Sequence, residues 1–189
     1  DFILNAGAGL QSNKLSYGAN LKFLYSHLES YSSLGMTVDA AATFEDTASQ
    51  FLATAIFKNM GAQFNPYTPG NREKLPFEIQ VGFSKRFKHL PFRISIVFHN
   101  LQRADIRYDD PNVFDNSSVI FQDSTTIKQK KYIADKIFRH VIGSGEFYFG
   151  KSFRLRFAYN HLRRRENSLD TKRGMTGLSI GFGVKIKQF

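Results

Sequence analysis

The chain has 189 residues, with 20 Phe and 8 Tyr, no Trp, no Cys, and a formal net charge of +10 at pH 7. That length allows one domain, the lack of cysteine excludes disulfides and cysteine metal sites, and no run approaches the roughly 18 apolar residues of a membrane helix. Abundant aromatic residues, frequent glycine and a negative mean hydropathy together suit a transmembrane β-barrel better than a small soluble sandwich.

The predicted elements are nine β-strands, because apolar residues recur with a period of two along nine segments. In chain order these segments are 2–10, 17–26, 35–44, 51–61, 77–84, 92–98, 145–149, 153–160 and 174–188. The hairpin formed by the fifth and sixth segments has the clearest alternation, with a polar connection between its arms and Pro91 where the second arm begins. The fold class is therefore all-β.

The connections between the predicted strands alternate in length. Short ones cover residues 11–15, 45–50, 85–90 and 150–152, and longer ones cover 27–34, 63–75, 101–144 and 161–173. An antiparallel up-and-down meander would place the short turns at one end and the long loops at the other, which is the layout of outer-membrane barrels. We expect a transmembrane β-barrel in the outer membrane of a Gram-negative bacterium, and a soluble sandwich is the alternative.

The strand count predicts that residues 1–189 form a single β-barrel domain from a larger barrel. If the short turns face the periplasm, the first strand starts outside the cell and the last ends in the periplasm. Bacterial single-chain barrels have an even number of strands, and their N-terminus is expected in the periplasm. Nine strands with an outside start therefore imply further strands.

The region 102–143 is predicted to be a long extracellular loop that contains one short amphipathic helix at about 131–141. Its apolar residues fall at helical spacing, with charged residues between them; they are Ile133, Ile137, Phe138 and Val141. Such a helix packs on the mouth of the barrel, docks a partner or covers the lumen.

No catalytic signature is present, and we expect a protein that is not an enzyme and uses no cofactor or metal. The sequence lacks a GxSxG elbow, an HExxH motif and a phosphate loop. The dipeptides Asn160-His161 and His99-Asn100 have no convincing serine nucleophile to accompany them.

The basic residues fall into two groups. The first alternates with apolar strand residues and would face the barrel lumen; it contains Lys22, Arg93, Arg154, Arg156 and Lys185. The second lies in the long loops and contains Arg163, Arg164, Arg165, Lys172, Arg173, Lys128, Lys130 and Lys131. The arginine guanidinium group matches the geometry of phosphate, so this second group suits contact with lipopolysaccharide and other outer-membrane lipids, or with an acidic protein partner. The alternative is that these residues are ordinary solvated loop residues. No nucleic-acid-binding motif accompanies the charge.

Five stretches carry a family resemblance: 17–44, 57–64, 72–103, 134–164 and 176–189. They resemble the PorV/PorQ family of outer-membrane barrels, which belongs to the type IX secretion system of Bacteroidota and is related more distantly to the FadL fatty-acid channels. The resemblance covers nearly the whole chain except 107–130, and it consists of long runs that are uninformative about chemistry.

The resemblance implies a FadL-like barrel of fourteen strands, of which about nine are represented here. It implies a non-enzymatic scaffold of the cell-surface attachment complex, which anchors a PorZ-like surface protein beside PorU and PorV homologues while secreted cargo is attached to the surface. The alternative is a FadL-like channel for a hydrophobic small molecule. The basic residues expected in the lumen disfavour an apolar tunnel of that kind.

Overall fold

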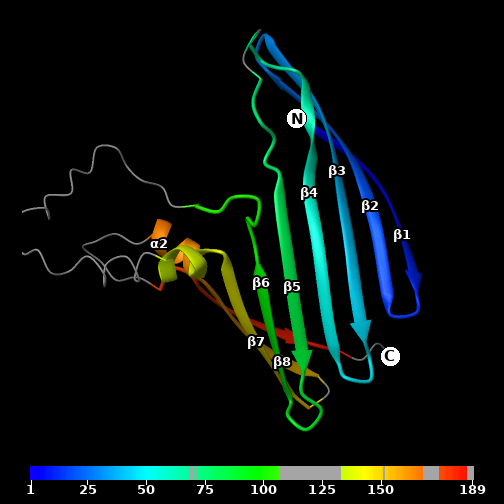
Figure 1. Cartoon of the computed structure of the whole chain (residues 1–189), viewed down its shortest axis with the longest axis vertical. Coiled ribbons are helices and arrows are strands. Elements are labelled where there is room, and N and C mark those ends of the chain that lie inside the picture. The colour runs from blue at the N-terminus through cyan, green and yellow to red at the C-terminus, as the bar shows by residue number, and fades with distance from the viewer. Residues whose placement is uncertain (69, 71, 107–132, 151, 168–174, 187–189) are drawn as a thin grey trace, which may run out of the picture.

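The computed structural model describes residues 1–68, 70, 72–106, 133–150, 152–167 and 175–186. These residues form one antiparallel sheet of nine strands, each paired with the next in chain order (Figure 1). The strands are β1 Phe2–Ser12, β2 Leu15–Leu28, β3 Tyr31–Asp46, β4 Phe51–Asn65, β5 Glu78–Arg86, β6 Phe92–Phe98, β7 Val141–Phe149, β8 Phe153–Asn160 and β9 Leu178–Val184. The prediction of an all-β, up-and-down antiparallel fold is confirmed.

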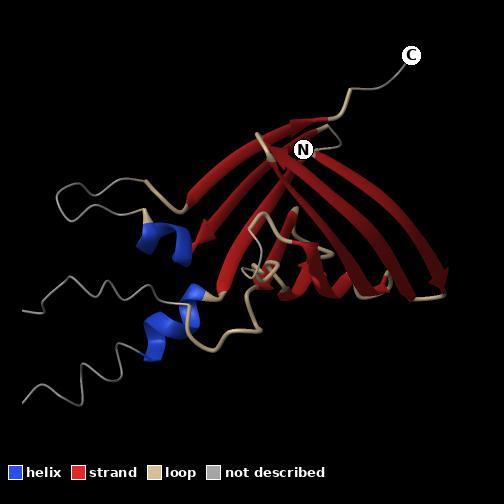
Figure 2. Cartoon of the chain, turned by 90° about the horizontal axis from the view of Figure 1, so that it is seen from above, coloured by secondary structure: helices blue, strands red, loops and turns tan. Residues whose placement is uncertain are grey.

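The sheet is curved, and its strands form an arc when viewed along their length (Figure 2). Among the described residues β1 and β9 are the two edges, and each pairs with a single neighbour. The long strands β1 to β4 make up one half of the arc and the shorter β5 to β9 the other (Figure 1).

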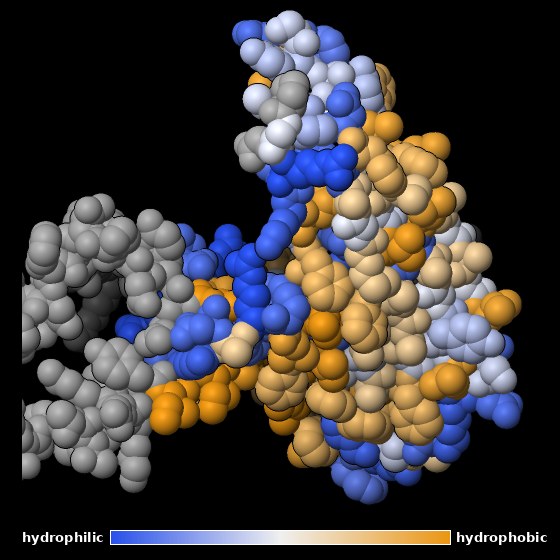
Figure 3. Space-filling model, turned by 45° about the horizontal axis from the view of Figure 1, so that its top comes forward, coloured by the Kyte–Doolittle hydropathy of each residue, from blue (hydrophilic) through white to orange (hydrophobic). Residues whose placement is uncertain are grey.

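The strand register gives the sheet one apolar and one polar face. Because neighbouring Cα partners point to the same side, Leu21 shares a face with Val38, and Phe83 shares the same face with Ile96. This row of apolar partners continues from Leu4 in β1 to Phe182 in β9. Figure 3 shows the resulting apolar band, with hydrophilic residues beyond both of its ends.

No described part of the chain covers the apolar face. Among the described residues no hydrophobic side chain is buried, and exposure reaches 68% for Leu4 and 78% for Phe182. In a soluble sandwich these side chains would meet a second apolar sheet and be buried. The described part of the chain contains a single sheet, so the stability of the fold rests on backbone pairing and on contacts within each face.

The loop predicted at 27–34 is wrong, because β2 and β3 are joined by a turn at Glu29 and Ser30. The ladder extends into polar sequence, with Ser26 opposite Ser33 and His27 opposite Ser32. Alternation fades there, but the backbone hydrogen bonds continue. The other three connections at this end remain longer than the turns at the opposite end.

Several other strand boundaries differ from the prediction, and β4 continues to Asn65, four residues beyond the predicted end. The seventh strand starts at Val141 instead of 145, because residues 141–144 pair with β6 from Phe98 back to Ser95. The predicted loop at 102–143 therefore ends before Val141. The last strand is shorter than 174–188, since β9 covers Leu178–Val184 and a turn occupies Thr176 and Gly177.

A β-bulge in β4 reverses the alternation of that strand. Val38 pairs with Met60 and Ala40 with Phe57, so one extra residue is accommodated between them, and Asn59 has a φ of 55°. Asp39 Oδ1 accepts a hydrogen bond from the backbone N–H of Asn59 at 2.8 Å. The bulge keeps both Phe57 and Met60 on the apolar face.

Two short helices lie at the end of the sheet that has the longer connections (Figure 1). One covers 133–139, inside the range of 131–141 expected from the sequence. The other, α2 His161–Glu166, directly follows β8 in a segment that was expected to be a plain loop.

Within the described segments, no helix is both long enough and apolar enough to cross a membrane.

Candidate functional site

The two helices are held together by one carboxylate, Asp135. Its Oδ2 accepts a hydrogen bond from Arg139 Nε at 2.9 Å, one turn along the same helix. Its Oδ1 lies 3.0 Å from His161 Nε2 and 3.0 Å from Arg165 Nε, both on α2. Asp135 therefore links the 102–143 region to the segment after β8, although 26 residues separate it from His161.

Opposing effects act on the pKa of Asp135. Partial burial raises the pKa, but hydrogen bonds from His161 and Arg139 and the charges of Arg139 and Arg165 outweigh it, so the pKa lies below its ordinary value. The Asp135 carboxyl group is therefore ionised in the folded protein at neutral pH. The ionised carboxylate accepts hydrogen bonds from three side chains at once, and these contacts hold the helix 133–139 against α2.

Helix α2 is short and positioned from both sides. The side chain of Asn160 caps it by accepting from the backbone N–H of Arg163 at 3.0 Å. Gly177 packs against its first turn at a φ of 87°, where an added Cβ would lie 2.6 Å from the carbonyl oxygen of Asn160. The backbone N–H of Asn160 donates to Gly177 at 2.8 Å, so α2 is fastened to the start of β9.

The predicted partner-contact residues divide into three sets. Arg165 is occupied by Asp135, whereas Arg163 and Arg164 are exposed on α2 and form no ion pair within the described residues. The remaining predicted contacts lie outside the described residues; they are Lys172, Arg173, Lys128, Lys130 and Lys131. Of the predicted contacts, Arg163 and Arg164 are therefore the two that lie exposed on the described surface without an ion pair.

A buried histidine joins the helix 133–139 to the sheet. His99, 6% exposed, donates its backbone N–H to His140 at 2.9 Å, and His140 Nδ1 donates to the carbonyl oxygen of His99 at 2.9 Å. Burial lowers the pKa of His99; the carboxylate of Glu78 opposes this effect, and the neighbouring His140 adds to it. His99 is consequently a neutral anchor for this connection.

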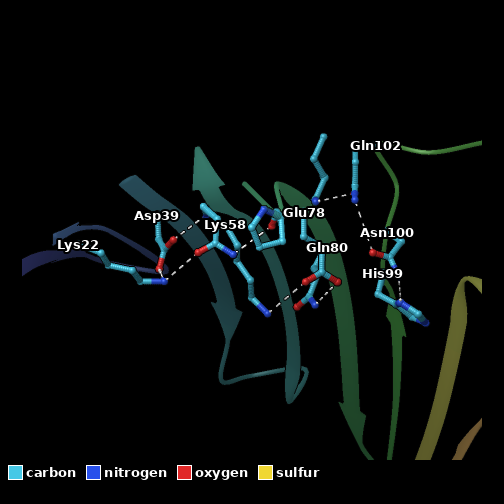
Figure 4. A network of polar contacts seen from close by, with 11 residues as sticks. Lys22, Asp39, Lys58, Glu78, Gln80, His99, Asn100 and Gln102 are labelled. Atoms are coloured by element: carbon cyan, nitrogen blue, oxygen red, sulfur yellow. Dashed lines mark hydrogen bonds and ion pairs between the residues drawn. The ribbon is translucent and has the colours of Figure 1, made fainter. Parts of the chain in front are cut away.

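A network of polar contacts extends across the sheet from β2 to the end of β6 (Figure 4). Lys22 Nζ lies 2.5 Å from Asp39 Oδ2 and 3.3 Å from Asn59 Oδ1, and Lys58 Nζ lies 3.8 Å from Glu78 Oε2. The Gln80 amide donates to Glu78 at 2.7 Å. These contacts satisfy polar side chains on the face opposite the apolar band.

Four of the five residues predicted to face a lumen, Lys22, Arg93, Arg154 and Arg156, lie on this polar face. Lys22 pairs with Asp39, while Arg93 and Arg156 both approach Glu146, at 3.7 and 2.8 Å. Arg154 lies over the ring of Tyr148 at 5.4 Å, and Lys185 follows the end of β9.

Sequence reasoning missed Asp135, Glu146 and Tyr148. The four-residue spacing of Asp135 and Arg139 is a signal that was available in the sequence. The meeting of Asp135 with His161 has no such signal, because it depends on how two distant connections return to the sheet. In the described residues, no group of three His, Asp or Glu side chains is placed to hold a metal ion.

Comparison with known proteins gives no match: no family model matches this sequence, and no curated protein or solved structure matches it.

Proposed function

We propose that this chain is part of an outer-membrane β-barrel that serves as a non-enzymatic scaffold for a cell-surface protein. The observation that carries the proposal is the uncovered apolar face, which runs without a break across all nine strands of one antiparallel sheet. Transmembrane barrels have such a face toward lipid and a polar face toward the lumen. Strands β1 to β5 and β7, of nine to sixteen residues, also reach the roughly 9–11 residues that a tilted strand needs to cross a bilayer, whereas β6, β8 and β9 have seven or eight.

Closure into a FadL-like barrel belongs to the same proposal. A curved sheet with two edges, β1 and β9, would present unpaired backbone groups to lipid, which is costly unless further strands complete the cylinder. The resemblance to the PorV/PorQ family implies fourteen strands. Nine of them would be represented by the sheet described above.

The scaffold role is supported by the end of the molecule that carries the helices. Asp135 and His99 fix the connections in place, and a fixed surface suits partner docking better than mobile loops do. Arg163 and Arg164 are exposed there and have no carboxylate partner within the described residues. We propose a PorZ-like surface protein as the partner, in a complex that includes PorU and PorV homologues, with lipopolysaccharide phosphates close by.

Purification of the full-length protein from native outer membranes in mild detergent tests this function. A surface protein that elutes with it stoichiometrically supports the scaffold, and Arg163→Glu and Arg164→Glu should each reduce the amount of that protein. Lys88→Glu, at the opposite end of the sheet, is the matched charge reversal and should leave it unchanged. A barrel that elutes alone with a bound fatty acid would refute the scaffold and favour the FadL-like channel.

A further inference from the structure

Four arginines gather around Tyr148 and Glu146 on the polar face, near the β5–β6 and β7–β8 turns. The register produces this cluster: Arg86 is opposite Arg93, Arg93 is opposite Glu146, and Glu146 is opposite Arg156. One pair further along, Tyr148 is opposite Arg154. Strands β5 to β8 thus bring four guanidinium groups, one phenol and one carboxylate onto a single surface.

The carboxylate of this cluster is fully engaged. Glu146 Oε1 accepts from Arg156 Nε at 2.8 Å, and Oε2 accepts from the Tyr148 hydroxyl at 2.6 Å and lies 3.7 Å from Arg93. Arg86 and Arg154 form no ion pair among the described residues. Their guanidinium groups lie 4.5 and 5.4 Å from the centre of the Tyr148 ring.

This arrangement leaves positive charge without compensation. Like charges directly opposite each other in a sheet are destabilising, and Arg86 and Arg93 are such a pair. Stacking on an aromatic ring orients a guanidinium group but uses none of its five N–H donors. The cluster therefore presents oriented N–H donors and excess positive charge. A bound anion would accept hydrogen bonds from the donors and neutralise the charge.

A hollow of about 380 Å³ lies beside Arg86 and Arg93, and Gln50 and Ser84 supply further polar groups to it. Two acidic residues, Glu45 and Asp46, also border the hollow. Asp46 is paired with Lys14 at 2.8 Å, and Glu45 forms no ion pair with either arginine in the structure. The volume of the hollow falls in the range of about 300–1,000 Å³ that small-molecule sites occupy, and Arg154 and Tyr148 lie outside its lining.

We propose that Arg86, Arg93 and Arg154, oriented by Tyr148, form a binding site for a phosphate-type oxyanion on the polar face. Guanidinium forks bind phosphate through paired, charge-assisted hydrogen bonds. The anion reaches the site from water, because the apolar band lies on the opposite face of the sheet. This site does not depend on the scaffold role.

Calorimetric titration of the full-length protein with inorganic phosphate, in an uncharged detergent at low ionic strength, tests the proposal. Saturable binding is expected, and Arg86→Gln and Arg154→Gln should each weaken it about tenfold, the loss of one charge-assisted hydrogen bond. These two arginines do not hold Glu146, so their removal leaves that carboxylate paired. Tyr148→Leu removes the ring and should also weaken binding.

The matched control is Lys88→Gln, which removes one charge from the neighbouring β5–β6 turn. Equal weakening in this control would show general charge attraction and overturn the proposal, as would the absence of saturable binding in the unmodified protein. Phosphatidylglycerol in mixed detergent micelles is the second ligand to test. If it binds and inorganic phosphate does not displace it, the proposal is overturned, because a lipid would then occupy the surface. Circular dichroism confirms that each variant is folded before titration.

Discussion

At the scale of single residues, close backbone approach and burial determine which positions tolerate change. Gly61 lies beside the bulge of β4, where an added Cβ would be 1.9 Å from the carbonyl oxygen of Met36 and 2.7 Å from the Cα of Thr37. Both atoms belong to the backbone of β3 and cannot rotate away. Position 61 therefore requires glycine.

Gly61→Ala should destabilise the protein by about 1–3 kcal/mol, the usual cost of forcing an extra group into a packed site. The thermal midpoint of the β-sheet signal in circular dichroism, recorded in detergent micelles, measures the effect. Gly143→Ala is the control, because an added Cβ at Gly143 meets no atom within 4 Å. Equal midpoints for the two variants would contradict this account of the bulge.

His99 should make stability depend on pH. Burial keeps its folded pKa below the ordinary value, so the unfolded chain binds the proton more readily. The stabilisation is present above about pH 6.5, the unfolded pKa, and is lost as the pH falls through the lower folded pKa. The midpoint should drop between pH 7 and pH 5, and less so in His99→Gln. Equal drops in both proteins would assign the effect to other groups, such as Glu78, Glu166 or His140.

At the scale of elements, Asp135 couples the helix 133–139 to α2. Asp135→Asn should loosen both helices and leave the sheet intact, because an amide cannot accept from His161, Arg139 and Arg165 as the carboxylate does. Amide hydrogen exchange in residues 133–139 and 161–166 should accelerate about tenfold or more, as expected for a lost charge-assisted hydrogen bond.

The control for this coupling is Lys136→Gln, which removes an exposed ion pair with Asp105, 3.5 Å away, from the same helix. Exposed pairs contribute little, so its exchange should remain close to that of the unmodified protein. Faster exchange spread evenly over β5 to β8 in Asp135→Asn would contradict a local role for Asp135.

At the scale of the whole molecule, adjacent residues in one strand should respond differently to the same charge. Ile96 lies on the apolar face near the middle of β6, and Val97 lies on the polar face. Ile96→Lys should cost about 2–4 kcal/mol on insertion into vesicles, as for lysine at the centre of a lipid-facing strand. Val97→Lys should insert nearly as well as the unmodified protein. Equal insertion of both variants would argue against a lipid-facing apolar side.

Alternation in the sequence was enough to predict the nine strands, their antiparallel order and their two faces, since a period of two directly reports which side a residue occupies. It failed where that signal is absent: polar residues continue the β2–β3 ladder, and the bulge at Asn59 reverses the phase within β4. The contacts of Asp135 and the arginine cluster around Tyr148 depend on strand register and on the return path of long connections. Of these contacts, only the pair Asp135–Arg139, four residues apart on one helix, is encoded in local spacing.

The most direct test of the membrane-facing account is a single-cysteine scan along β5, which the absence of native cysteine makes clean. Spin labels at residues 79–84 of the protein in lipid vesicles are probed with oxygen, which concentrates in the bilayer, and with a water-soluble nickel chelate. We predict that Ile79, Val81 and Phe83 collide mainly with oxygen, and that Gln80, Gly82 and Ser84 collide mainly with the chelate. Uniform accessibility to the chelate at all six positions would contradict the account.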